Sequence, residues 1–325
     1  MVNKKKLRVY RESVDGNYIA TLTIGKEYLD RWEKYSLPFW RIYCNEHGLG
    51  LVALEEPFFD HGKKRNDWQK LLVGHAIKHQ GLYAERVCFV DYDIVPNPFA
   101  LNIFNELEKT KIGFVSQRNG LPQGNVDDLL RNIALHRHNS SCGKYPLDSY
   151  ITRSPEDIFS DYGLFRHKDY GCGGLFVFNM ELHNDYFIEV FNKYDCNSLF
   201  VANAGEEVYL NHHIQSRDDF EWLPYQWHTQ WWYEMGCYYP WLYNECNRKS
   251  EIIQEAILAT LLRSNFIHFV GSWEKWAWLY LAHINYSELI IKLKEFRDYQ
   301  RIKLKSPSIG LIFPDNPIEN KIISK

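Results

Sequence analysis

The sequence lacks several features that would assign it to common classes of protein. Its 325 residues contain 7 Cys, but no C-x-x-C pair and no spacing typical of a zinc site. A formal net charge of -3 provides no basic field for binding nucleic acid. The basic start MVNKKKLRVY lacks the apolar core of a signal peptide, and no apolar run is long enough to span a bilayer. We therefore expect a cytoplasmic protein with reduced cysteines, no transmembrane segment and no nucleic-acid partner.

What the sequence does contain is typical of a folded enzyme-sized chain. Hydrophobic residues make up 45% and charged residues 24%, which predicts a globular protein with a substantial core. The aromatic fraction of 16%, with 11 Trp and 22 Tyr, is high. Aromatic rings with polar edges are common where proteins contact sugars, although most rings lie in the core.

The order of strand-like and helix-like segments predicts an α/β fold. Residues 17–25 and 87–90 are strand-like, and the segments 26–40 and 65–80 between them have helical spacing of apolar residues. Such alternation predicts a mixed, mostly parallel sheet flanked by helices. Further expected strands are 111–117, 173–179, 221–227 and 265–271. The polar region 117–168 is expected to be a long irregular loop, and 284–305 a surface helix.

Two acids, Asp91 and Asp93, directly follow the apolar run 87–90. Ligands of open α/β sheets bind at the carboxyl ends of strands, so these acids lie where a site is expected. Two adjacent carboxylates repel each other unless a cation lies between them, and hard oxygen ligands suit Mg²⁺ or Mn²⁺. The alternative is a strand end at which Asp caps a turn before Pro98.

Three later segments combine glycine, acids and histidine with apolar strands. GCGGLFVFN (171–179) has Gly173 and Gly174 before a strand, where the backbone can approach a ligand or form a tight turn. GEEVYLNHHIQ (205–215) starts with two acids that suit either a site or the N-terminus of a helix. IHFVGSWEKWAW (267–278) has a His within an apolar strand, which is either a ligand or a core residue.

The order of these four motifs resembles that of the retaining glycosyltransferases of family 8, which include glycogenin and the lipopolysaccharide galactosyltransferases. That family has D-x-D, a strand ending in Asn, D-Q-D-x-L-N and H-F-x-G-x-x-K-P-W in the same order. The segment EEVYLN is also similar to the acidic motif of family 6. The resemblance spans residues 17–278 and implies a GT-A fold. In this sequence Cys172 stands where family 8 has Asn, and Lys275 lies one residue later than the family's Lys.

The resemblance implies a role for each motif. Asp91, Asp93 and His268 would bind Mn²⁺ or Mg²⁺, and Glu207, with Glu206 on the sugar hydroxyls, would act at the anomeric carbon. The nucleotide-sugar donor would be contacted by Thr21, Thr23, Lys70, Asp91, Tyr92, Gly173, Gly174, Gly271 and Lys275.

We therefore expect a metal-dependent retaining glycosyltransferase that transfers a hexose from a nucleotide sugar, a UDP-sugar in particular, to a carbohydrate acceptor, in surface polysaccharide or glycan synthesis. The catalytic domain would be 1–283, with a nucleotide-binding half (17–105) and an acceptor half (106–283), followed by a C-terminal helix and tail (284–325). The aromatic segment 222–241 would line the acceptor side, belong to the core, or form an interfacial patch that contacts a lipid-linked acceptor or a membrane. The alternatives are a lectin-like carbohydrate-binding protein and a sugar-nucleotide pyrophosphorylase.

Overall fold

The computed structural model describes residues 6–59, 64–147, 150–194, 205–270, 274–283 and 286–305. The chain forms two compact units, Met1–Ile284 and Asn285–Lys325. The second unit contains α11 (Tyr286–Lys305), which confirms the helix predicted there. Within the described ranges, no helix is both long enough and apolar enough to cross a membrane.

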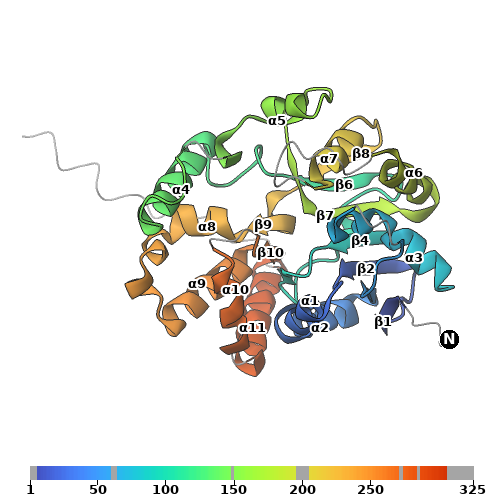
Figure 1. Ribbon diagram of the computed structural model, residues 1–325. Helices are drawn as coiled ribbons and strands as arrows, with labels where there is room; N and C mark the ends of the chain where they lie inside the picture. Colours follow the sequence, from blue (N-terminus) through green and yellow to red (C-terminus); the bar gives the residue numbers. More distant parts are fainter. Residues whose placement is uncertain are drawn as a thin grey trace, which may run out of the picture. The chain divides into compact units, whose positions relative to one another are not determined.

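The first unit contains a seven-stranded sheet with the order β1-β3-β2-β4-β7-β6-β8 (Figure 1). Strands β2, β3, β4, β6 and β8 run in one direction and β1 and β7 in the other, so the predicted mixed, mostly parallel sheet is confirmed. The strands are β1 (Leu7–Arg11), β2 (Asn17–Leu22), β3 (Gly50–Leu54), β4 (Arg86–Val90), β6 (Ile112–Ser116), β7 (Gly171–Asn179) and β8 (Phe220–Leu223).

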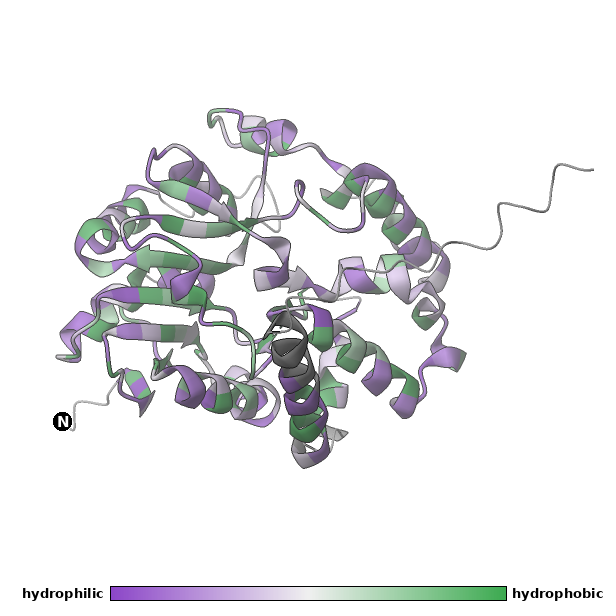
Figure 2. Ribbon diagram, turned by 180° about the vertical axis from the view of Figure 1, so that it is seen from behind, coloured by the Kyte–Doolittle hydropathy of each residue, from purple (hydrophilic) through white to green (hydrophobic). Residues whose placement is uncertain are grey.

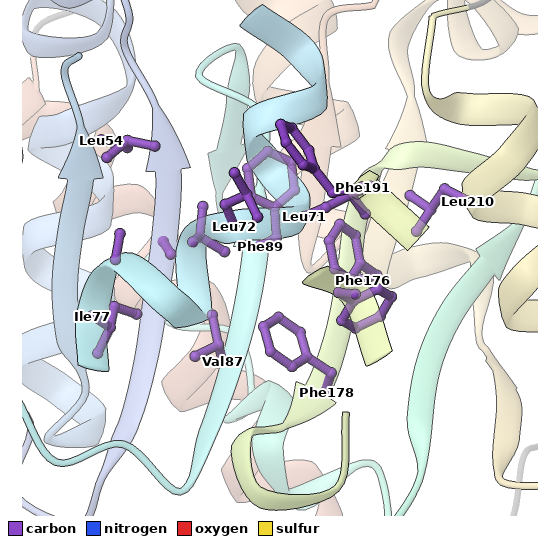
Figure 3. Close-up of a cluster of buried hydrophobic side chains, with 14 of the residues drawn as sticks. Leu54, Leu71, Leu72, Ile77, Val87, Phe89, Phe176, Phe178, Phe191 and Leu210 are labelled. Carbon is purple, nitrogen blue, oxygen red and sulfur yellow. The ribbon is translucent and has the colours of Figure 1, made fainter. Parts of the chain in front are cut away.

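Helices cover both faces of this sheet, as the continuous apolar runs of its central strands require. In β4, Val87 and Phe89 point to one face while Cys88 and Val90 point to the other, and all four are buried. The first face packs against η2 (Asn66–Leu72), α3 (Val73–His79), α6 (Met180–Lys193) and α7 (Glu207–Gln215), and Figure 3 shows side chains of this cluster. The second face packs against η1 (Trp32–Ser36) and α2 (Leu37–His47). Apolar residues accordingly concentrate along the strands in Figure 2.

A second, three-stranded sheet has the order β5-β10-β9, with β5 (Ile94–Pro96), β10 (Phe266–His268) and β9 (Thr229–Gln230). Strand β5 begins three residues after Asp91, and it pairs antiparallel with β10, so that Ile94 lies opposite His268. This pairing brings a late segment of the chain to the carboxyl end of β4. The remaining α-helices of the first unit are α1 (Lys26–Arg31), α4 (Val126–Ser140), α5 (Pro155–Asp161), α8 (Trp231–Tyr238), α9 (Ser250–Arg263) and α10 (Trp276–Leu279).

The prediction of a long irregular loop over 117–168 was wrong, because this region contains α4 and α5. Helix α4 buries Leu129, Leu130 and Ile133, which have helical spacing, and it begins where the Asn125 side chain accepts hydrogen bonds from two backbone N–H groups. The many polar residues of α4 lie on its other face and obscured this spacing in the sequence.

The aromatic segment 222–241 belongs mainly to the core. The predicted strand 221–227 ends at Leu223, because Pro224 lacks the backbone N–H that a ladder needs, and a 3₁₀ turn, η5 (Tyr225–His228), follows. Trp231 is 0% exposed and Trp232 8%, so neither offers a ring face to a saccharide. Of the alternatives for this segment, the core therefore fits these two residues, and among its tryptophans Trp241, at 48%, is the most exposed.

Candidate active site

Three segments that are distant in sequence meet at the carboxyl end of β4. Strand β7 runs antiparallel to β4, with Val90 opposite Leu175, and the Asp91 N–H donates to the Gly174 carbonyl at 2.8 Å. Strand β10 arrives through its pairing with β5, and the Phe269 N–H donates to the Asp93 carbonyl at 3.1 Å. The two ladders therefore fix Asp91, Asp93 and His268 around one point.

The side chains of these three residues form a cluster that fits a divalent cation. His268 Nε2 lies 3.3 Å from Asp93 Oδ1 and 3.8 Å from Asp91 Oδ2, and one ligand atom from each residue lies within 4.8 Å of the other two. Asp93 Oδ1 is buried and has no hydrogen-bond partner among the residues that the structure describes. A buried carboxylate oxygen without a partner is costly. Two carboxylates and an imidazole suit Mn²⁺ or Mg²⁺, and a cation would satisfy this oxygen.

Lys275 forms an ion pair with the other carboxylate oxygen of Asp93, Oδ2. Its Nζ lies 2.5 Å from Asp93 Oδ2 and donates to the Tyr92 hydroxyl at 2.7 Å. Burial alone would raise the pKa of Asp93, but Lys275 and then His268 outweigh it and hold that pKa below its ordinary value. Asp93 is therefore an anion with one oxygen committed to an ammonium and one directed toward the cluster.

The neighbouring Glu274 does not belong to this cluster. Glu274 is fully buried, and its carboxylate accepts hydrogen bonds from Arg137 Nε at 2.8 Å and Arg137 Nη2 at 2.7 Å. The Tyr243 hydroxyl donates to the same carboxylate at 2.8 Å. Glu274 thus points away from the cluster, and the next residue, Lys275, points into it.

Lys70 is a buried cation beside the cluster of Asp91, Asp93 and His268. It comes from η2, and its Nζ lies 2.6 Å from Glu206 Oε1 and 3.5 Å from Asp91 Oδ1, while it donates to the Gly173 carbonyl at 3.1 Å. Burial alone would lower the pKa of Lys70, but Asp91 and Glu206 raise it above its ordinary value. Lys70 therefore remains an ammonium, and it bridges Asp91, which follows β4, and Glu206, which precedes α7.

Glu206 and Glu207 stand at the start of α7, but neither acts as a simple helix cap. The Glu206 side chain makes no capping hydrogen bond and instead pairs with Lys70. Glu207 Oε1 accepts from the Gly173 N–H at 3.3 Å and from Gln117 Nε2 at 3.1 Å. Burial, and then the charge of Glu206, raise the pKa of Glu207 to about 7. The Glu206 carboxylate is thus paired with Lys70, whereas Glu207 is a buried acid with a raised pKa.

The two glycines before the body of β7 provide space for these groups. A Cβ on Gly174 would lie 2.5 Å from His268 Cε1 and 2.9 Å from Asp91 Oδ2, which is too close for any side chain. A Cβ on Gly173 would lie 3.3 Å from Glu207 Cγ. Glycine at 174 is therefore required because Asp91 and His268 approach its backbone closely. A tight turn is not the reason for it.

A cavity of about 610 Å³ opens over the cluster, a volume in the range of small-molecule sites. Its charged lining residues are Lys64, Arg65, Asp67, Lys70, Asp91, Asp93, Glu206, Glu207 and Lys275, with His268 beside them and Tyr92 at the wall. Thr21 and Thr23 do not line it: they are buried, and their neighbours Leu22 and Ile24 face the cavity instead. Gly173 and Gly174 are not among the residues that line it, and Gly271 lies outside the described residues.

Several residues at this site were not predicted from the sequence, among them Lys64 and Arg65 of the cavity lining, Asp67 and His228. Asp67 lies three residues before Lys70, hence on the same side of the helical turn, and its side chain is hydrogen-bonded to Glu206. Burial, and then Glu206, raise the pKa of Asp67 to about 7. His228 lies behind His268, and its Nε2 is 2.8 Å from His268 Nδ1. The spacing from Lys70 could have indicated Asp67, whereas nothing in the sequence around His228 marks it.

No protein-family model matches the chain, and no curated protein matches its sequence. In structure the chain is similar to a glycosyltransferase involved in the glycosylation of the major capsid of PBCV-1, with a TM-score of 0.47 and 10% identity over 82% of this chain and 99% of that one. It is also similar to the glycosyltransferase GlyE of Streptococcus pneumoniae TIGR4, with a TM-score of 0.45 and 12% identity over 92% of this chain and 66% of that one. The bifunctional glycosyltransferase WbbM gives a TM-score of 0.40 and 11% identity over 86% and 52%. Likenesses this distant assign no activity, so the argument for function depends on the site.

Proposed function

We propose that this protein is a metal-dependent glycosyltransferase that transfers a hexose from a nucleotide sugar, a UDP-sugar in particular, to a carbohydrate acceptor with retention at the anomeric carbon. The observation that carries the proposal is the meeting of Asp91, Asp93 and His268 in a charged cavity, where the buried Asp93 Oδ1 has no partner among the described residues. In sequence, these residues also occupy the positions that the resemblance to family 8 predicts for the metal ligands.

The balance of charge in the cavity suits a diphosphate bound together with a cation. Five acidic side chains line it, and four basic ones, Lys64, Arg65, Lys70 and Lys275, accompany them. A diphosphate alone would add negative charge beside Asp91 and Asp93, and this repulsion in a partly buried site would be large. A divalent ion on these acids would offset the added charge, so donor and metal are expected to bind together.

The remaining groups have roles that follow from their contacts. The metal, when bound, would stabilise negative charge on the departing diphosphate. Lys275, within reach of the same acids, would contribute a second cation at that position. Glu207 would stabilise positive charge at the anomeric carbon or attack it, which is the contribution that retention requires. Lys70 orients Glu206, whose carboxylate would accept hydrogen bonds from sugar hydroxyls.

The two halves of the catalytic domain are proposed from the elements that border the cavity. Residues 17–105 would form the nucleotide-binding half, because they supply β2, η2 and β4, whose ends border the cavity. Residues 106–283 would form the acceptor half, and they supply α7 and β10. The buried aromatic residues of 222–241 leave the acceptor contacts to other residues of this half.

The experiment is a thermal-shift screen of nucleotide sugars with and without Mn²⁺, followed by an assay for release of the nucleotide diphosphate. A ligand that binds the native state only raises the melting temperature, by mass action. We expect a UDP-sugar to stabilise the protein only when Mn²⁺ or Mg²⁺ is present, and slow metal-dependent hydrolysis to release UDP. A lectin would bind saccharide without releasing UDP. The absence of stabilisation by every nucleotide sugar with metal, or inversion of the product, would contradict the proposal.

A further inference from the structure

His268 faces two different partners with its two ring nitrogens. Nε2 is directed toward Asp91 and Asp93, and Nδ1 lies 2.8 Å from Nε2 of His228. The two ring planes are nearly parallel, 13° apart, and the centroids are 4.8 Å apart, so that the rings meet edge to edge; His228 is 0% exposed. Cys172 Sγ is the other polar atom beside Nδ1, at 3.6 Å.

The distance between the two ring nitrogens shows whether they could share a metal ion or are joined by a hydrogen bond. Cys172, His228 and His268 could together be ligands of a soft metal ion, since one donor atom from each lies within 4.8 Å of the others. Two nitrogens bonded to one tetrahedral ion at about 2.0 Å would lie more than about 3 Å apart. The observed 2.8 Å is instead the length of a strong hydrogen bond between the rings.

A neutral imidazole has one N–H and one lone pair, so the hydrogen bond determines which nitrogen of His268 can bind a metal. A lone pair on Nε2 requires a proton on Nδ1, and that proton needs an acceptor. His228 Nε2 is placed to accept it. His228 Nδ1 has no hydrogen-bond partner among the described residues, whether it carries a proton or a lone pair. This atom therefore does not decide whether His228 Nε2 accepts a hydrogen bond from His268 or donates one to it.

We propose that His228 is a positioning residue, which accepts a hydrogen bond from Nδ1 of His268 and so holds the Nε2 lone pair of His268 toward the cation bound by Asp91 and Asp93. This inference rests on the metal site of the proposed function. It assigns a role to a residue that touches neither metal nor substrate, in the way that partners of a ligating histidine fix its tautomer and ring orientation.

The experiment measures binding of Mg²⁺ and of Mn²⁺ alone to the full chain by calorimetry. His228→Met keeps a similar volume but removes the acceptor, and it should weaken affinity about 10–100-fold, as is typical for such partners. His228→Gln retains an acceptor oxygen near the position of Nε2, and its affinity should be close to that of the wild type. Cys172→Ala is the matched control, because it removes the other neighbour of Nδ1 and should leave affinity unchanged.

Nitrogen-15 NMR of the Mg²⁺-loaded wild type shows which nitrogen of His268 carries the proton. This measurement needs no variant, so it is valid even if a substitution at His228 prevents folding. The proton of His268 should lie on Nδ1. A proton on Nε2, a His228→Met variant that binds as the wild type does, or a His228→Gln variant as weak as His228→Met would each overturn the inference. A wild type that binds neither ion would instead contradict the metal site itself, so the two failures are distinguishable.

Discussion

At the scale of single residues, Asp93 is distinguished by the different environments of its two carboxylate oxygens. Oδ2 pairs with Lys275 at 2.5 Å, whereas Oδ1 is buried without a hydrogen-bond partner among the described residues and lies 3.3 Å from His268 Nε2. The position therefore needs a full carboxylate, because one oxygen holds an ammonium and the other is available to a cation.

Asp93→Asn should abolish tight metal binding while leaving most of the fold intact. The amide keeps the shape but removes the negative charge, and an N–H₂ group in place of Oδ1 cannot bind a cation. Calorimetry should show that affinity for Mn²⁺ falls by more than about tenfold. Asp218→Asn, on an exposed acid outside the cavity, is the control and should bind as the wild type does. Full metal-dependent activity in Asp93→Asn would contradict the assignment.

Glu207 should show its role in turnover and in pH dependence. Its pKa is raised to about 7 by burial and by Glu206, against the opposing effect of Lys70 and of the Gly173 N–H, while Asp91 adds a smaller increase. A carboxyl with a raised pKa is protonated below that value, so activity that needs the carboxylate should rise with pH through about 7.

Glu207→Gln should lower kcat far more than it changes donor KM, since the charge acts mainly in the transition state. It should also reduce the rise of activity with pH to whatever Asp67, whose pKa is likewise raised to about 7, contributes. The measurement is a pH–rate profile of both proteins, with Glu251→Gln on the exposed face of α9 as the control. If Glu206→Gln were the more damaging change, the two acids would have exchanged roles.

At the scale of elements, the buried pair of Arg137 and Glu274 joins α4 to the segment that carries Lys275. The Arg137 side chain is 5% exposed and that of Glu274 0%, and two hydrogen bonds connect them. Removing one partner of such a pair leaves an uncompensated charge in the interior, whereas replacing both with apolar residues is often neutral.

Arg137→Met should therefore lower the free energy of unfolding by about 3–5 kcal/mol. Arg131→Met is a matched control on the same helix, because the Arg131 side chain is 72% exposed and its pair with Asp128 is a surface contact. The control should change stability by no more than about 0.5 kcal/mol. Urea unfolding measures both. Adding Glu274→Met to Arg137→Met should recover much of the loss, and equal effects of Arg137→Met and Arg131→Met would contradict this account.

At the scale of the whole molecule, the sequence predicted the sheet and the meeting of Asp91, Asp93 and His268 better than it predicted the cavity wall. The apolar runs of β4 and β7 predicted buried strands, and the acids after β4 pointed to the edge where ligands bind. The position of α4 was missed because its polar face is wide. The place of Trp231 could not be decided between the core and the acceptor side, because a run of rings has the same composition in a core as on a surface. His228 could not be found, since its contact with His268 depends on the pairing of β9 with β10.

The space at Gly174 offers a way to separate binding from chemistry. A single methyl group there would intrude between Asp91 and His268 without deleting any ligand, charge or hydrogen-bonding group. Gly174→Ala should thus keep the ion out by displacing Asp91 or His268, while no other side chain of the cavity is replaced. Such a variant would hold an acceptor saccharide without converting it, and it would make the acceptor identifiable by the saccharide that it retains.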